Sequence, residues 1–387
     1  MEDILTGLSE IDGQIGELKI LGFPFEEIAN HASFEELIFL FFYGNAPSAD
    51  ELRRFTRILS DKRTLSTPII DLLRILARQQ IEPVEALRLG VSALSLDMKE
   101  DMLRKDGLSG ALKIIASIPT IVATYWRLVN YLPIITPHED LNHTANYLYM
   151  LTGEKPKSKS VRGLEAYFAT VVEHGLNAST FSARVIISTR SDLVSAVTGA
   201  IGALKGVLHG GAPGPALEML LEISDIRYAE RYLRHKLENG ERLMGFGHRV
   251  YRVQDPRARF LATVAKQIWE DKDNTEFWSL ALGVERIALR LLKEYKPGRS
   301  IQTNVEYYTA LLLHGLGLPT AIFTPTFAIS RVIGWIAHCF EQLETSNIIR
   351  PRSKYIGLKD RHWEPNTMER KEFGQVYHLF DHVEMKS

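Results

Sequence analysis

The sequence is poor in cysteine: of its 387 residues, only Cys339 carries a thiol. One thiol cannot form a disulfide within the chain, and it cannot supply the paired thiolates of a zinc site. Cys339 lies in an apolar pattern at helical spacing, so nothing marks it as a ligand. The sequence therefore favours a reducing compartment, and we expect the cytoplasm.

An excess of charge and long apolar runs are absent as well. The formal net charge is −1, which argues against nucleic acid or a membrane surface as a partner, because both need a concentrated positive field. The N-terminal residues lack a basic region followed by an apolar run, and no stretch of about 18 uncharged apolar residues occurs later. We expect neither export nor a membrane span, and local arginines must meet any anionic ligand.

Repeats, low-complexity tracts and Gly/Ser linkers are also missing, so any domain boundary must be a tight crossing. Glycines and short alternating runs up to about Phe25 predict a small β-hairpin. Beyond it the patterns are almost all helical. Ser33 with Glu36 and Ser48 with Glu51 form capping boxes, and the first helix should stop at Gly44. Further helices are expected from about Pro68, Pro83, Ser109, Glu139 and Val161.

The second half of the chain continues the helical pattern. An apolar helix should run from about Ser191 toward the glycines at 210 and 211, and later helices should cover 215–224, 228–238, 256–270, 276–295, 305–315 and 325–344. We predict an all-α fold with two domains. Residues 1–210 begin a large domain, 211–319 form a small domain, and 320–387 complete the large domain and add a tail that is partly extended after Tyr355.

One segment resembles a site more than a scaffold. His209 should lie on the last turn of the apolar helix or just beyond it, before Gly210 and Gly211, where paired glycines let another molecule approach the backbone. The alternative is a core histidine before a glycine-rich cap. Two further histidines, His174 and His248, also stand beside glycines. None of the three has a partner at metal-ligand spacing, so we expect no metal and assign them to proton transfer or to hydrogen bonds with a substrate oxygen.

Three arginines are candidates for binding an anion. Asp255 is the predicted N-cap of a helix with Pro256 as its first residue, which places Arg257 in the first turn, where the helix dipole and a guanidinium would both attract an anion. Arg331 lies among apolar residues at helical spacing, so burial would require an acidic side chain or a ligand carboxylate. The third, Arg350, is equally consistent with a surface loop.

A carboxylate joins the three histidines and three arginines as a candidate site residue. Asn304 can cap a helix whose first turn contains Glu306, although an acid there is also an ordinary feature of helix starts. The segment Gly245-Phe246-Gly247 is not a dinucleotide fingerprint, because a third glycine and a βαβ pattern are missing.

Together these segments resemble citrate synthases. The likeness rests on Asn-Ala-Ser-Thr-Phe after His174, Leu-His-Gly-Gly-Ala around His209, Gly-Phe-Gly-His-Arg-Val-Tyr around His248, Asp-Pro-Arg at 255–257, and Ser-Arg-x-x-Gly-Trp around Arg331. It covers nearly the whole chain and is closest to the short, dimeric bacterial and archaeal type. The resemblance implies a helical homodimer and an acyltransferase that condenses acetyl-CoA with oxaloacetate and water to citrate and CoA, without a further cofactor.

The resemblance also implies roles for the candidate residues. His174, His248, Arg257 and Arg331 would hold oxaloacetate, together with Arg350 from the other subunit. His209 would hydrogen-bond the enol formed from acetyl-CoA, with His248 and Glu306 as the other catalytic residues. The CoA moiety would lie along Leu243, Met244, Gly245, Phe246 and Gly247, with its phosphates near Arg252.

The sequence departs from the family pattern at the base. Glu306 occupies the position of an aspartate, and Thr303 replaces the proline usual before the motif. The extra methylene shifts the carboxylate by about an ångström, and such a misplacement can lower a rate roughly a hundredfold. Two alternatives therefore stay open: a 2-methylcitrate synthase, which uses propionyl-CoA, and a degenerate protein that senses oxaloacetate or citrate with little turnover.

Overall fold

The computed structural model describes residues 4–98, 107–211, 213–247, 251, 253–272, 275–345, 347–357 and 359. The chain divides into two compact units, Glu2–Ile349 on one hand and Met1 with Arg350–Ser387 on the other. All described helices and strands belong to the first unit, and residues 350–357 of the second have no regular secondary structure. The tail predicted after Tyr355 lies mostly outside the described residues.

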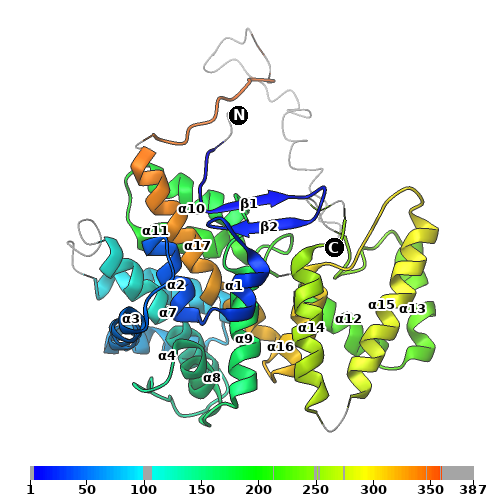
Figure 1. Cartoon of the computed structure of the whole chain (residues 1–387), viewed down its shortest axis with the longest axis horizontal. Helices are drawn as coiled ribbons and strands as arrows, with labels where there is room; N and C mark the ends of the chain where they lie inside the picture. Colours follow the sequence, from blue (N-terminus) through cyan, green and yellow to red (C-terminus); the bar gives the residue numbers. More distant parts are fainter. Residues whose placement is uncertain are drawn as a thin grey trace, which may run out of the picture. The chain divides into compact units, whose positions relative to one another are not determined.

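A small antiparallel sheet opens the chain (Figure 1). Strand β1 (Ser9–Asp12) pairs with β2 (Glu17–Ile20), with Ser9 opposite Ile20, and β2 pairs with β3 (Phe23–Pro24). The turn between β1 and β2 closes with Gly16 at φ +74, and its N–H donates to the carbonyl oxygen of Asp12 at 2.9 Å. The predicted hairpin is confirmed, and β3 extends it by a short third strand.

Both predicted capping boxes are present. Ser33 and Glu36 exchange side-chain to backbone hydrogen bonds at the start of α2 (Phe34–Tyr43), and Ser48 and Glu51 do the same for α3 (Ala49–Asp61). Helix α2 ends where Gly44 adopts φ +78, a conformation that other residues avoid. These ends are fixed by neighbours within four residues, which is why the sequence predicts them well.

The rest of the first unit is mostly helical, as predicted. Its other helices are α1 (Phe25–His31), α4 (Thr67–Arg78), α5 (Pro83–Ala93), the 3₁₀ helix η1 (Leu94–Leu96), α7 (Gly107–Val129), α8 (His143–Thr152), α9 (Ser158–Val171), α10 (Ala178–Ser188), α11 (Leu193–Leu204), α12 (Pro213–Ile223), α13 (Ile226–Glu238), α14 (Pro256–Glu270), α15 (Glu276–Tyr295), α16 (Val305–Gly315), η2 (Thr320–Ile322) and α17 (Phe323–Thr345). Helices α1 and α10 were not predicted from the sequence.

The predicted start of α8 at Glu139 is wrong by four residues. Asn142 is the N-cap, and its side chain accepts the N–H of Ala145 at 2.7 Å. Glu139 and Asp140 precede this cap in a segment without helix. The carbonyl of Glu139 instead accepts a hydrogen bond from Ser60 Oγ at 3.1 Å, a contact that no local pattern reveals.

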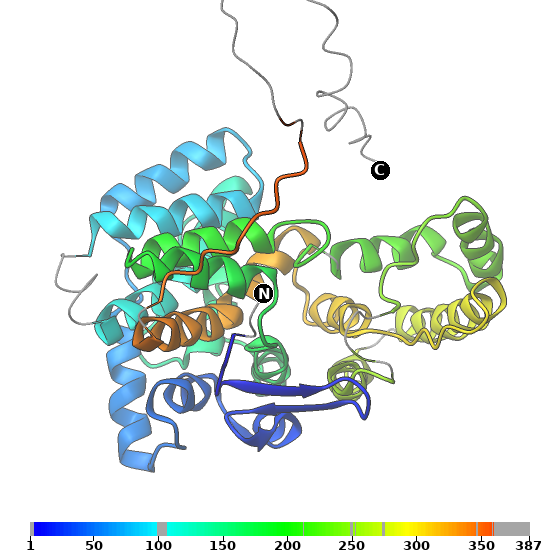
Figure 2. The same cartoon turned by 90° about the horizontal axis from the view of Figure 1, so that it is seen from above.

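Two long apolar helices form the core of this unit. Helix α17 packs against α7, α9, α10 and α11, and Figure 2 shows it among them in orange. Both α7 and the stretch 320–345 are long and apolar enough to cross a membrane, but 78% of each apolar window is buried inside the protein. Trp335 of α17 has no exposed surface. Helix α17 therefore supplies a fixed, fully packed backbone for the residues it carries.

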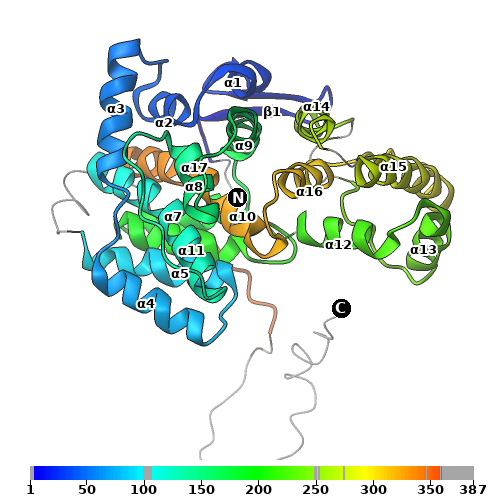
Figure 3. The ribbon, with the colours of Figure 1, turned by 90° about the horizontal axis from the view of Figure 1, so that it is seen from below.

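A second group of helices lies on the side away from α3 and α4 in all three ribbon views (Figures 1, 2 and 3). Here α13 packs against α15, and both α12 and α14 pack against α16. Helix α14 also contacts α9, which joins this group to the core helices. The boundaries predicted for two domains, at 211 and 319, stay a prediction.

Candidate active site

His209 lies in a turn beyond α11, whereas the helix was predicted to continue to the glycines at 210 and 211. The helix ends at Leu204, five residues before His209, whose N–H donates to the carbonyl of Gly206 at 2.8 Å. Its Nε2 lies 2.8 Å from the Ser179 hydroxyl, whereas Nδ1 makes no hydrogen bond with the described residues. Burial lowers the pKa of His209 to about 4, and the nearby Arg331 cation adds to the shift. The ring is therefore neutral at pH 7, with one nitrogen left for a ligand.

Ser179 lies at the junction of three elements. The indole Nε1 of Trp335 donates to Ser179 Oγ at 3.0 Å, and Ser179 Oγ lies 2.7 Å from Asn177 Oδ1. Asn177 is the N-cap of α10 and accepts the N–H of Thr180. These contacts hold the hydroxyl, and through it the ring of His209. No role was predicted for Ser179 or Trp335, although both lie in motifs that carry the resemblance to citrate synthases.

Arg331 is buried in α17, as predicted, with 2% of its surface exposed. Its Nε donates to the carbonyl oxygen of Val171, and its guanidinium carbon lies 4.7 Å from the centre of the Phe327 ring. Burial lowers the pKa of Arg331 to about 10, although the Glu173 carboxylate opposes the shift. Within the described part of the chain, no carboxylate forms an ion pair with Arg331. The guanidinium can therefore receive a carboxylate from a ligand.

Arg257 occupies the first turn of α14, and Asp255 is the N-cap, as predicted. The Asp255 carboxylate accepts the Arg257 N–H at 2.9 Å and pairs with its guanidinium at 2.8 Å. Burial by itself lowers the pKa of Arg257, but Asp255 outweighs it, so the net shift is upward. The charge of Arg257 thus has a protein partner, in contrast to Arg331.

Glu306 lies in the first turn of α16. Burial raises the pKa of its carboxyl above the ordinary value, while the charge of Arg257 opposes the shift. Its Oε2 atom is buried and has no hydrogen-bond partner among the described residues. Because burial disfavours the charged form, a desolvated carboxylate binds a proton more readily than a solvated one, which suits a general base.

The segment predicted to contact CoA lies against the loop that carries Glu306. Phe246 bridges to Thr303, Asn304 N–H donates to the Gly245 carbonyl at 2.9 Å, and Gly247 N–H donates to the Gln302 carbonyl at 2.8 Å. Gly245 has φ +89, and a β-carbon there would lie 2.7 Å from the Tyr307 ring. Position 245 therefore requires glycine, and backbone contacts join the two segments.

Asn304 is the N-cap residue of α16, but its side chain does not cap the helix. The amide donates instead to the carbonyl of Gly247 at 3.0 Å. The predicted capping bond is therefore wrong. The side chain joins two segments across 57 residues of sequence, which spacing alone cannot show.

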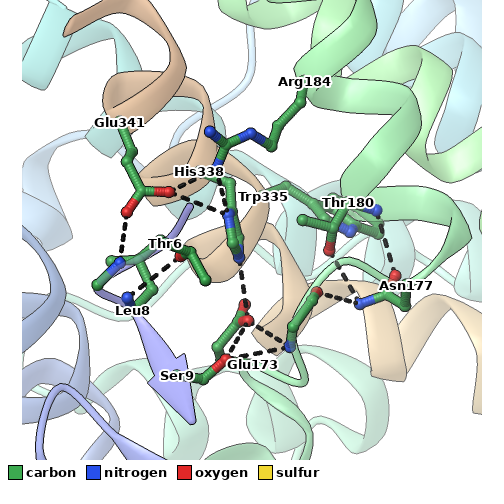
Figure 4. A network of polar contacts seen from close by, with 12 residues as sticks. Thr6, Leu8, Ser9, Glu173, Asn177, Thr180, Arg184, Trp335, His338 and Glu341 are labelled. Atoms are coloured by element: carbon green, nitrogen blue, oxygen red, sulfur yellow. Dashed lines mark hydrogen bonds and ion pairs between the residues drawn. The ribbon is translucent and has the colours of Figure 1, made fainter. Parts of the chain in front are cut away.

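His174 lies beside a buried polar network (Figure 4). The Glu173 carboxylate, which has no exposed surface, accepts hydrogen bonds from Ser9 and from the N–H of Gly175, and it lies 3.0 Å from His338 Nε2. Arg184 contacts the other ring nitrogen of His338 at 3.0 Å and pairs with Glu341. The network fixes the segment that carries His174, whose Nε2 lies 3.3 Å from the Tyr251 hydroxyl.

Helix α17 approaches this segment closely at Gly334. A β-carbon there would lie 2.5 Å from the Val172 carbonyl oxygen and 2.6 Å from Glu173 Oε2.

Three further site predictions have no geometric test. His248 and Arg252 lie outside the described residues, and Arg350 is an exposed residue of the other unit. The described residues contain no group of three or more His, Cys, Asp or Glu side chains that could hold a metal ion.

Comparison with known proteins identifies the family. Residues 2–352 match the family model described as "Citrate synthase, C-terminal domain". A citrate synthase of Haloferax volcanii is 39% identical over 92% of this chain and 94% of its own length, and a 2-methylcitrate synthase of Mycobacterium tuberculosis is 36% identical over 92% and 88%. A citrate synthase of Thermoplasma acidophilum was solved in a ternary complex with carboxymethyl coenzyme A and oxaloacetate. It superposes on this chain with a TM-score of 0.86 at 30% identity, covering 94% of this chain and 96% of that one. The chain therefore belongs to the citrate synthase family.

Proposed function

We propose that this enzyme condenses acetyl-CoA with oxaloacetate and water to give citrate and CoA. One observation carries the proposal. His209 with a free ring nitrogen, Arg331 without a carboxylate partner among the described residues and the desolvated Glu306 belong to three separate elements. Beyond the effect of burial, Arg331 lowers the pKa of His209, and Arg257 acts on the pKa values of both Arg331 and Glu306, so these groups lie within electrostatic reach through the two arginines. Such a set suits the binding of a dicarboxylate next to a carbon acid.

The dicarboxylate would bind first of all to Arg331, whose guanidinium has no ion-pair partner in the described part of the chain. Arg257 would add a second cation at the N-terminus of α14, although Asp255 already shares its charge. His174 and His248 would hydrogen-bond the substrate, and Arg350 of the second subunit would complete the site. No bound cofactor is required, since acetyl-CoA is itself a substrate.

The chemistry would begin at the thioester. Glu306 takes a proton from the methyl group of acetyl-CoA while His209 hydrogen-bonds the oxygen of the resulting enol. The enol carbon attacks the ketone carbon of oxaloacetate and forms the new carbon–carbon bond. The enol oxygen loses its proton as the thioester carbonyl reforms, and the former ketone oxygen takes up a proton to become a hydroxyl. Water then cleaves the thioester and releases CoA. The segment from Leu243 to Gly247, with Arg252, would hold the CoA moiety beside the loop of Glu306.

The proposal includes a homodimer in the cytoplasm, with 1–210 and 320–387 forming the large domain of each subunit and 211–319 the small domain. Site residues from two chains would make the isolated subunit inactive. Size-exclusion chromatography with light scattering would give the mass, which should be twice that of the 43.8 kDa chain.

The test is release of free CoA from acetyl-CoA and from propionyl-CoA, each with oxaloacetate. Faster release from acetyl-CoA supports the proposal. The similarity to a 2-methylcitrate synthase makes that activity the second candidate, and a preference for propionyl-CoA would favour it. Oxaloacetate binding by calorimetry without release from either thioester would favour a sensor and contradict both enzymes.

A further inference from the structure

A carboxylate on α15 contacts the chain on both sides of Glu306. Glu285 accepts a hydrogen bond from the Thr303 hydroxyl, and it accepts one from the Tyr308 hydroxyl, which lies 2.8 Å from each of its oxygens. Thr303 comes three residues before Glu306, and Tyr308 comes two residues after it. Thr303 is buried, with 3% of its surface exposed. The bonds to Glu285 therefore span the first turn of α16.

The start of α16 depends on such contacts because it lacks a local cap. Asn304 uses its side chain to bond Gly247, so this N-cap residue does not cap the first free N–H groups of the helix. The backbone of 302–304 is bonded to Gly245 and Gly247 on one side. Glu285 is the contact on another helix that holds Thr303, the residue before the cap.

The position of the Glu306 carboxylate follows from that of the backbone. Its Oε2 has no hydrogen-bond partner in the described part of the chain, so no donor holds this oxygen in place. An error of about an ångström at a reacting group can lower a rate roughly a hundredfold. A glutamate base thus needs a backbone set at a defined distance from the substrate.

We propose that Glu285 is a positioning residue, which acts through the Thr303 hydroxyl to hold the loop 303–306 where the carboxylate of Glu306 reaches the methyl proton. The inference rests on the proposed function, since it takes Glu306 as the base. Neither Glu285 nor Thr303 needs to contact a substrate. Their loss should therefore lower kcat, while oxaloacetate binding at Arg331 and Arg257 stays unchanged.

If Glu285 and Thr303 only stabilised the fold, their loss would lower the melting temperature without a specific loss of kcat. Tyr307 provides a matched control for this distinction. The Tyr307 hydroxyl donates to the carbonyl of Ala281 at 2.7 Å, so it also joins α16 to α15. This bond does not reach Thr303. Tyr307→Phe removes the buried hydroxyl between the same two helices and keeps the ring against Gly245. It should lower the melting temperature and leave kcat within about twofold.

The experiment compares Thr303→Val, Thr303→Ser and Glu285→Ala with Tyr307→Phe in steady-state CoA release. We expect the valine and alanine variants to lose kcat by roughly tenfold or more, with the KM for oxaloacetate within about twofold. Thr303→Ser keeps a hydroxyl at position 303, so the kcat of this variant should stay within about threefold of the unmutated value. The Thr303→Val, Glu285→Ala double variant should be no slower than the slower single variant, because each change already removes the Thr303–Glu285 hydrogen bond.

Several outcomes would overturn the proposal. A Thr303→Val enzyme that keeps more than half its kcat, a proportionate rise in KM, or an equal loss in Tyr307→Phe would each assign Glu285 to stability alone. Circular dichroism checks the fold; should Thr303→Val not fold, Glu285→Ala tests the same bond from α15. An unmutated protein that releases no CoA would overturn the proposed function, and this inference with it, whereas an active enzyme with unaffected variants would overturn only the inference.

Discussion

The hydroxyl of Ser179 lies 2.8 Å from Nε2 of His209, across 30 residues of sequence. Because this contact occupies one ring nitrogen, the orientation of the other nitrogen depends on it. Trp335 fixes the hydroxyl in turn through its indole N–H. The ring that is predicted to polarise the thioester is thus held by two residues of the core.

His209→Ala should lower kcat by about a hundredfold or more, with little change in oxaloacetate affinity, because its hydrogen bond forms with the enol. Ser179→Ala should lower kcat by roughly tenfold, since the ring loses its orientation. Ser182→Ala is the control: among the described residues, its hydroxyl, on the same helix, bonds the carbonyl of Ala178 and no other group. A Ser179→Ala enzyme as fast as Ser182→Ala would show that the contact has no catalytic role.

Glu306→Gln should abolish CoA release and leave oxaloacetate binding nearly intact, because an amide cannot accept the methyl proton. Single-turnover assays and calorimetry separate the two quantities. Retention of more than a small fraction of the rate would point to another base. Glu306→Asp tests the geometry: a faster aspartate enzyme would mean that the side-chain length of Glu306 limits the reaction, and a slower one that the loop is adapted to glutamate.

Arg331→Leu should raise the KM for oxaloacetate by roughly thirtyfold or more, with a much smaller effect on the KM for acetyl-CoA. The effect of Arg257→Leu should be smaller, because Asp255 already pairs with that guanidinium. Arg234→Leu, which removes an exposed ion pair with Glu294, serves as the control. Equal changes in both KM values would give Arg331 a structural role.

The lowered pKa of His209 predicts a pH dependence of stability. The unfolded ring takes up a proton near pH 6.5 and the folded ring only near pH 4, so the unfolded state binds more protons between these values. The folded state therefore loses stability as the pH falls from 6.5 toward 4, by less than about 3 kcal/mol because the ring is partly exposed. His209→Gln should lose less stability than the unmutated protein between pH 7 and pH 4.5 in urea unfolding. Equal losses would contradict the shift.

The dimer prediction is tested by complementation. A His209→Ala homodimer and an Arg350→Ala homodimer should both be nearly inactive. Refolded together, random pairing puts about half the dimers in the mixed form, each with one intact site, so activity should return to about a quarter of the unmutated level. If mass spectrometry shows mixed dimers but activity stays at the level of the parents, Arg350 does not act in the site of the other subunit.

Local signals predicted much of the fold. The bounds of α14, α15 and α16 agree with the prediction, because caps, prolines and apolar spacing act within a few residues. Helices α1 and α10 were missed. The first follows β3 without a capping box, and the second is capped by Asn177, a residue read only as part of a motif.

The sequence predicted which residues belong to the candidate site, but it did not predict which residues these side chains contact. Burial of Arg331 followed from its apolar neighbours, whereas its bond to the Val171 carbonyl depends on the packing of α17 against the end of α9. The same holds for Ser179 with Trp335 and for Thr303 with Glu285, pairs separated by 156 and 18 residues. Such pairs depend on the tertiary fold, and the spacing of apolar residues within one helix does not predict them.

Gly334 has a consequence for the precision of the site. With no side chain at that position, main-chain atoms of α17 lie against the Val172 carbonyl and the Glu173 carboxylate. The separation between the helix of Arg331 and the segment of His174 is thus a van der Waals distance between nearly rigid groups. The nearer of the two contacts is to a main-chain carbonyl, so a change of side-chain rotamer does not relieve it. Even an added methyl group would widen that separation.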